Sequence, residues 1–183
     1  DLHGDVEVAG GAATEPPEFL AAPEIENIAD YLVVLDNFIE EKIKPLGSKD
    51  DNIRWATIEA LGAGGNKAAV KPLMALLSHS DKHTRWKAVD ALGALGDKRA
   101  ISALREQGKS DDFVYVRLGA VEALMKIDPE FRQLYHRHRE LDKQVLDAEL
   151  GVLPLDDNTL ARMKKEKLNA KDRLTRMFDQ RRH

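Results

Sequence analysis

The side chains best suited to chemistry in this chain are two histidines and an aspartate spaced two residues apart. His79, Asp81 and His83 are residue types that bind zinc or iron. Three ligands across a polar turn are too few to define such a site, and we favour Asp81 as the cap of a helix that begins there. His136 and His138 are two apart on an expected helix, so they point to different faces. The sequence therefore predicts no metal and no other cofactor.

Other catalytic arrangements are missing. The glycine-rich run at 62–65 follows an expected helix rather than a strand, so it lacks the context of a phosphate-binding loop. There is no cysteine, which excludes disulfides, cysteine–zinc sites and thiol nucleophiles. No nucleophilic triad or pair of catalytic carboxylates stands out. We therefore expect a protein that is not an enzyme.

Two tryptophans are the strongest candidates for binding another protein. Trp55 and Trp86 each directly follow an arginine, and exposed tryptophan is a typical interface anchor. If both are partly exposed, they should lie side by side as an aromatic patch. The alternative is that they fill a gap beneath an N-terminal helix. Four further residues, near the C-terminus, are predicted to contact a partner: Leu160, Met163, Leu174 and Met177.

The tryptophans belong to a segment that occurs three times. The copies read IRWATIEALG at 53–62, TRWKAVDALG at 84–93 and VRLGAVEAL at 116–124. The arginines of successive copies, Arg54, Arg85 and Arg117, are 31 and 32 residues apart. A fixed period of this length indicates stacked helical units, because one unit cannot bury its apolar face alone. We expect the arginines to tie neighbouring units together rather than to face a partner.

Capping residues predict where the helices of each unit begin and end. Asp50 or Asp51 should open the first helix and the run at 62–65 should end it; a second helix follows at 67–77. Asp81 should open the next pair, with Gly93 and Gly96 in its turn. A third unit is expected at about 112–126, before a break at 128–129.

The flanking segments complete an all-α fold. We expect an extended or disordered acidic arm at 1–23, a capping helix at 24–46 and about three repeats at 47–129. Residues 130–183 show the apolar spacing of an antiparallel helical hairpin, with its turn at 151–155. Such a hairpin has a thin core, so it is expected to pack on the repeats or pair with another chain.

Charge is distributed unevenly along the 183 residues. The balance is −9 over 1–45, close to neutral over 46–130 and +4 over 131–183. Because the basic end is interleaved with acids, we expect a solvated helix with ion pairs four residues apart, and no nucleic-acid binding. No apolar run is long enough to span a membrane, although peripheral association with a membrane complex is compatible with the composition. The absence of cysteine does not fix the compartment; a cytoplasmic location is favoured.

The repeats resemble the short HEAT-like repeats first associated with phycobilisome lyases. The shared features are the arginine followed by small residues, Ala-Leu-Gly, and then Gly-Asp-Lys at 96–98 with its counterpart Gly-Asn-Lys at 65–67. The resemblance covers about 50–128 and implies an α-solenoid, but no particular function. The enzyme of this repeat class that hydroxylates deoxyhypusine holds two irons with His-Glu pairs. This sequence has no such pair, so that activity is not carried over.

Residues 131–178 resemble the small bacterial helical-hairpin family called YdcH-like. The matching stretches are HRELDK at 138–143, KKEKL at 164–168 and Lys171-Asp172. The resemblance implies a bacterial origin and a helical interaction module, and it brings no known chemistry.

These observations lead us to expect a non-catalytic adaptor or accessory subunit that binds other protein subunits of a larger bacterial complex. One alternative is a lyase-like or chaperone-like assembly factor that holds a chromophore or a client protein. A second is a relative of metal-dependent oxygenases. A third is the soluble end of a larger electron-transfer protein, suggested by a first residue other than methionine and by the cytochrome-like segment at 28–32.

Overall fold

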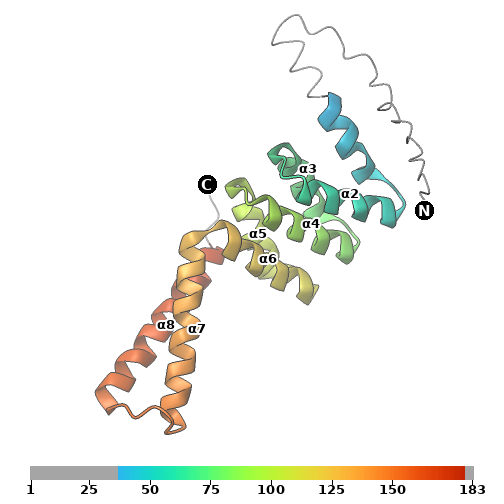
Figure 1. Ribbon diagram of the computed structural model, residues 1–183. Helices are drawn as coiled ribbons and strands as arrows, with labels where there is room; N and C mark the ends of the chain where they lie inside the picture. The colour runs from blue at the N-terminus through green and yellow to red at the C-terminus, as the bar shows by residue number, and fades with distance from the viewer. Residues whose placement is uncertain (1–36, 180–183) are drawn as a thin grey trace, which may run out of the picture. The chain divides into compact units, whose positions relative to one another are not determined.

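Helices make up all of the regular secondary structure in the computed structural model, which describes residues 37–179 (Figure 1). Residues 37–43 are helical and lead into the short 3-10 helix η1 (Lys44–Gly47). The helices that follow are α2 (Asp51–Ala63), η2 (Lys67–Ala69), α3 (Val70–Ala75), η3 (Leu76–Ser78), α4 (Lys82–Leu95), η4 (Lys98–Ala100), α5 (Ile101–Ser110), α6 (Val114–Ile127), α7 (Pro129–Glu149) and α8 (Asp157–Asp179). The expected arm at 1–23 and the first part of the expected capping helix lie outside the described residues.

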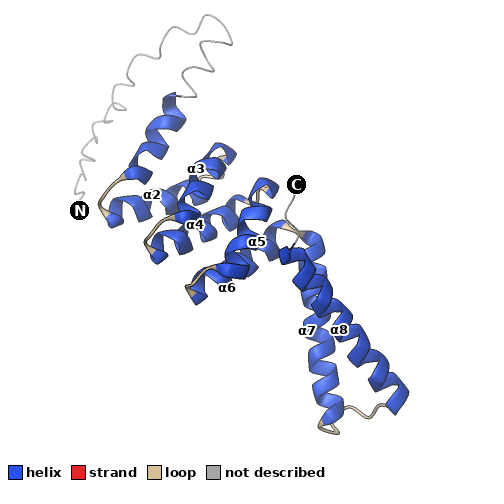
Figure 2. Ribbon diagram, turned by 180° about the vertical axis from the view of Figure 1, so that it is seen from behind, coloured by secondary structure: helices blue, strands red, loops and turns tan. Residues whose placement is uncertain are grey.

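The helices between α2 and α6 stack in two layers. Helix α2 packs on α4 and α4 packs on α6, so that these three lie side by side as the first layer (Figures 1 and 2). Helices α3 and α5 form the second layer and pack on α4 and α6, respectively. This is the short α-solenoid that the repeat period predicts.

Aspartate caps set the helix starts. The side chain of Asp50 accepts from the Asn52 N–H, and the side chain of Asp81 accepts from the N–H groups of His83 and Thr84. These bonds satisfy backbone donors that have no partner within a helix, which confirms the capping role predicted for Asp81. Gly96, in the left-handed region at φ 64°, ends α4 as expected.

The run at 62–65 ends α2 as predicted, with Gly64 at the C-cap, but the prediction for Gly93 was wrong. Gly93 lies inside α4 rather than in its turn, and Gly62 is the next-to-last residue of α2. A Cβ atom at Gly62 would lie 2.9 Å from the Cβ of Ala91, and a Cβ at Gly93 would lie 2.9 Å from the Cβ of Ala123. These glycines are therefore the points of close approach between neighbouring helices of the first layer.

One apolar core runs through the stack. Its buried members come from every repeat and include Leu73, Leu92, Leu104 and Leu124. Phe131, near the start of α7, belongs to the same core, and half-buried Leu134 and Tyr135 pack against it. The first turns of α7 thus occupy the place that α3 and α5 take in the earlier repeats. The same helix then continues into the hairpin.

Helices α7 and α8 form the antiparallel hairpin (Figure 2). Four ion pairs join them: Glu130 with Arg173, Arg137 with Glu166, Asp142 with Lys167, and Glu149 with Lys164. The pair at the start of α7 lies toward the end of α8, and the pair at the end of α7 lies toward the start of α8. One further pair lies within a single helix, Arg137 with Glu140, and it is three residues apart; among the described residues no pair of the hairpin has the expected spacing of four. Away from the repeats, the buried apolar residues of the hairpin are Leu141, Val145 and Ala170. Its core is thin, as expected.

The C-terminal end of α8 returns to the repeats. The ring of Phe178 lies against α5, where a Cβ at Gly108 would come within 2.8 Å of it. Phe178 also packs edge-on against Phe131, with ring centroids 5.6 Å apart. Lys109 of α5 pairs with Asp179 at 2.6 Å. The end of the hairpin therefore covers the last repeat. Among residues 37–179, no helix has both the length and the apolar character needed to cross a bilayer.

Candidate protein-interaction surface

The repeated arginines hold the first layer together. The Arg54 Nε donates to the Thr84 hydroxyl of the next repeat at 3.1 Å, and its Nη1 donates to the Ser48 carbonyl at 2.6 Å. The Arg85 guanidinium makes two hydrogen bonds to the Asp111 carboxylate, of 2.8 and 3.0 Å. Bidentate pairs of this kind fix geometry strongly. The predicted structural role of Arg54 and Arg85 is confirmed.

These contacts change the acidity of the partner carboxylates. Burial alone would raise the pKa of Asp111, but hydrogen bonds from Arg85 outweigh it and hold that pKa below its usual range. Burial also acts to raise the pKa of Asp81, and the hydrogen bonds from Thr84 and His83 lower it to about 2. Both carboxylates are therefore ionised at neutral pH and serve as acceptors for the network.

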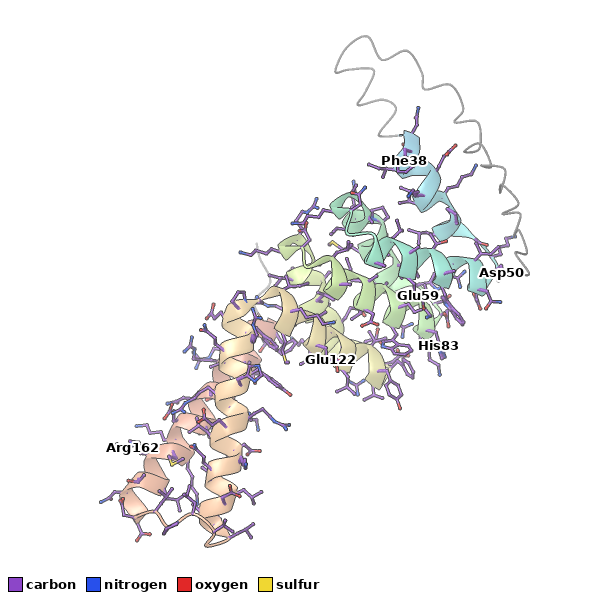
Figure 3. The ribbon with its side chains drawn as sticks, in the orientation of Figure 1. Phe38, Asp50, Glu59, His83, Glu122 and Arg162 are labelled. Atoms are coloured by element: carbon purple, nitrogen blue, oxygen red, sulfur yellow. The ribbon has the colours of Figure 1, made fainter. Side chains whose placement is uncertain are left out.

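Five rings form a continuous aromatic row across the starts of the first-layer helices. In order they are Trp55, His83, Phe113, Tyr115 and Trp86, with successive ring centroids 5.9, 5.8, 5.2 and 6.3 Å apart. Figure 3 labels His83 at the start of α4. Among the described residues, Trp55 and Trp86 make no direct ring contact and are connected through the three rings between them.

The tryptophans differ in their surroundings. Trp55 is half-buried, and its indole nitrogen donates to the Thr84 hydroxyl at 3.0 Å. Trp86 keeps 40% of its surface exposed, and its ring lies over Gly119 of α6. Trp86 is thus the tryptophan available to another molecule, while Trp55 supports the layer.

Exposed large apolar residues of the repeats gather on the first layer. Beside Trp86, Tyr115 and Leu118 are 56% and 54% exposed, and Val114 is also exposed. We call Trp86, Tyr115 and Leu118 the α4–α6 surface. Within the described residues, α3 and α5 expose no large apolar side chain. A contiguous apolar surface on one layer only is typical of a protein-binding face.

Sequence reasoning missed Tyr115 and Leu118. Leu118 follows Arg117 and so occupies the position that Trp55 and Trp86 hold in their repeats, a signal that the alignment of the copies contained. Tyr115 lies in the first turn of α6, and only the stacking of α4 on α6 brings it to Trp86.

The four hairpin residues predicted to contact a partner are divided by the fold. Met177 is buried in the core of the repeats, and Leu174 packs half-buried against that core. Leu160 and Met163 are half-buried in the first half of α8. A partner role for Leu160 and Met163 stays a prediction, whereas Met177 has its contacts within the chain.

The turn end of the hairpin exposes other apolar residues. Leu146, Leu150 and Val152 are all more than half exposed, as is Leu168 on α8. Figure 3 labels Arg162 in this region. The thin core here leaves more than half of each of these residues exposed, so this end is a second candidate contact.

The polar turn that contains His79 is structural. The Asp81 N–H donates to His79 Nδ1 at 3.0 Å, and the His83 ring lies between those of Trp55 and Phe113, tilted against both. Within the part of the chain that the structure describes, no three metal-ligating side chains come together. The contacts of His79, Asp81 and His83 hold the turn and the neighbouring aromatic rings in place.

Fold and surface together define an all-α repeat protein of the interaction type. A family model described as HEAT repeats matches residues 40–125, and HEAT solenoids generally serve as protein-interaction scaffolds. A second model, described as "Protein of unknown function (DUF465)", matches residues 131–178. The matches place HEAT repeats at 40–125 and the helical hairpin directly after them, in the order that the sequence predicted. No curated protein matches it.

Proposed function

We propose that the protein is a non-catalytic adaptor or accessory subunit that docks onto a larger bacterial protein complex through the α4–α6 surface. The observation that carries this proposal is the exposure of Trp86, Tyr115 and Leu118 on a layer fixed by the arginine network. Aromatic residues held in place on a rigid support lose little conformational entropy on binding, and they commonly dominate interface energies.

The hairpin would supply a second contact with the same complex. Its exposed residues Leu146, Leu150 and Val152 lie at the end of α7 and in the adjoining turn. Two separate contacts on one chain raise the effective concentration of the second once the first has formed. An adaptor that joins two subunits would use both.

The test is affinity purification from the native cell at low detergent, with mass spectrometry of the retained proteins. We expect stoichiometric subunits to be retained by the wild-type protein and lost by the triple variant Trp86→Ala/Tyr115→Ala/Leu118→Ala. The matched control is Lys71→Ala/Ser102→Ala, which removes two exposed side chains from α3 and α5 and should keep the subunits bound. Circular dichroism and urea unfolding establish that both variants are folded.

Each outcome has a distinct meaning. A wild-type chain that retains no stoichiometric protein contradicts the adaptor proposal. A pigment or a substoichiometric client retained in its place would support an assembly factor that holds a chromophore or a client. Full retention by the triple variant would show that the complex is bound through another surface.

A further inference from the structure

A row of acidic side chains runs beside the apolar residues of the first layer. In each repeat an acidic residue lies four positions after the residue that follows the repeated arginine. These acids are Glu59 after Trp55, Asp90 after Trp86, and Glu122 after Leu118. Residues four apart on a helix share a face, so this acidic row is parallel to the apolar one and one helical turn away. Figure 3 labels Glu59 and Glu122 on the first layer.

Most of this acidic charge is uncompensated. Glu59 pairs with Lys87, whose ammonium also lies 5.8 Å from the Trp55 ring. Asp90 and Glu122 are exposed, and among the described residues neither forms an ion pair. The face therefore presents two carboxylates next to Trp86 and Leu118.

A hollow beside Trp86 suits the aliphatic part of a long side chain. Small residues, among them Gly62, Ala91 and Ala94, line it together with Glu59, Lys87 and Asp90. Lys87 pairs with Glu59, which leaves the Asp90 carboxylate without an ion pair among the described residues. A lysine or arginine can lay its methylene groups on these small residues while its cationic head stays near the Asp90 carboxylate. An acidic side chain placed there would instead meet like charge.

The spacing of the rows fits an α-helix laid across the layer. Packed helices lie roughly 8–10 Å apart, which sets the distance between equivalent positions of neighbouring repeats. An α-helix advances about 10.5 Å in seven residues. Apolar residues repeating every seven positions would then meet Trp86 and Leu118 in turn, and basic residues along one flank would meet Asp90 and Glu122.

We infer that the first layer binds a basic amphipathic helix of a partner protein, with apolar residues on the α4–α6 surface and lysine or arginine side chains on Asp90 and Glu122. This inference rests on the proposed adaptor function and specifies the chemistry of its ligand. Apolar contact gives the affinity, and the acidic row selects the sign of the partner's charge.

The experiment uses the full chain and two synthetic helices. One is a three-heptad peptide with leucine at every seventh position, lysine along one flank and alanine elsewhere. The other carries glutamate in place of each lysine. Binding is followed by the fluorescence anisotropy of labelled peptide, and a benzophenone on the leucine stripe allows the bound site to be located by cross-linking.

We expect the lysine peptide to bind at least about tenfold more tightly than the glutamate peptide, with cross-links to α4 or α6. The variant Asp90→Asn/Glu122→Gln should weaken the lysine peptide roughly fivefold, as two exposed ion pairs would. Trp86→Ala should weaken it by about 30-fold, as loss of an interface anchor would. The control Glu106→Gln/Asp172→Asn removes two acids from α5 and α8 and should leave binding unchanged.

Equal affinity for the two peptides would overturn the inference, as would cross-links outside the first layer. So would an equal loss of affinity for the lysine peptide in Asp90→Asn/Glu122→Gln and in the control Glu106→Gln/Asp172→Asn. Failure here is distinguishable from failure of the adaptor proposal. If the native complex still depends on Trp86 and Leu118 while the lysine peptide shows no preference, the adaptor function stands and the ligand is of another chemistry.

Discussion

The indole nitrogen of Trp55 and the hydroxyl of Thr84 are 3.0 Å apart, and this contact joins the first repeat to the second. The same hydroxyl accepts from the Arg54 Nε and donates to the Asp81 carboxylate at 2.7 Å. Thr84 is fully buried. The Thr84 hydroxyl oxygen thus connects Trp55, Arg54 and the α4 cap residue Asp81.

Replacing this oxygen should destabilise the stack. Thr84→Val keeps the shape of the side chain but leaves two donors without their acceptor, so we expect a loss of about 2–3 kcal/mol in the free energy of unfolding. Thr84→Ser keeps the hydroxyl and loses one methyl group, for an expected cost of about 1 kcal/mol. Urea unfolding measures both. A serine variant as unstable as the valine variant would show that packing, and not the hydroxyl, matters here.

Close packing at Gly93 gives a second prediction. Alanine favours a helix over glycine by about 1 kcal/mol, but the added methyl at Gly93 would meet Ala123, and overpacking costs about 1–3 kcal/mol. We expect Gly93→Ala to be destabilising despite its better helix propensity. Gly47→Ala is the control, because a Cβ there meets nothing within 4 Å.

A double variant separates contact from propensity at this position. Adding Ala123→Gly to Gly93→Ala removes the clashing methyl group, so we expect a favourable coupling of about 1 kcal/mol in a thermodynamic cycle. If the two changes add to within about 0.5 kcal/mol, the two helices do not meet there.

The attachment of the hairpin should depend on Phe178. Phe178→Ala removes a half-buried ring from between Gly108 and Phe131, and we expect a loss of about 2 kcal/mol. Hydrogen exchange should become faster in the last turns of α8 and stay unchanged in α2 and α4. Leu168→Ala, on the exposed side of the same helix, should change stability by less than about 0.5 kcal/mol. Unchanged exchange in α8 would argue against a docked hairpin end.

Acid should weaken the cap of α4. The Asp81 pKa falls from its ordinary 3.8 to about 2 in the folded chain, because hydrogen bonds from Thr84 and His83 outweigh the burial that would raise it. A depressed folded pKa adds stability that is complete above the unfolded pKa and is lost as the pH falls through the folded one. The contribution of Asp81 should therefore disappear between about pH 4 and pH 2.

Two variants isolate this titration. Asp81→Ala should lose about 1 kcal/mol at neutral pH, and its difference from the wild type should shrink as the pH approaches 2. Asp81→Asn keeps an acceptor that does not titrate, so it should retain most of the stability at every pH. A constant difference for the alanine variant across this range would contradict the assignment.

Local signals predicted most of the helices. Asp81 and Gly96 mark the ends of α4 because capping and left-handed backbone depend on the residue itself. Gly93 was misplaced because glycine also occurs where helices pack closely, and that packing depends on a neighbouring repeat. The aromatic row was missed for the same reason: His83, Phe113 and Tyr115 meet only once the repeats are stacked.

Helix α7 completes the third repeat with its first turns and then continues as the first helix of the hairpin. A change in its angle at the repeats would therefore move the far end of the hairpin. The 21 residues of α7 span about 30 Å, so a tilt of about 10° at Phe131 would move the far end by roughly 5 Å. A protein bound at Leu150 would then contact the end of the same helix whose first turns pack in the core of the repeats. Such a joint also closes the array, because the place of a fourth repeat is already taken by Met177 and Phe178.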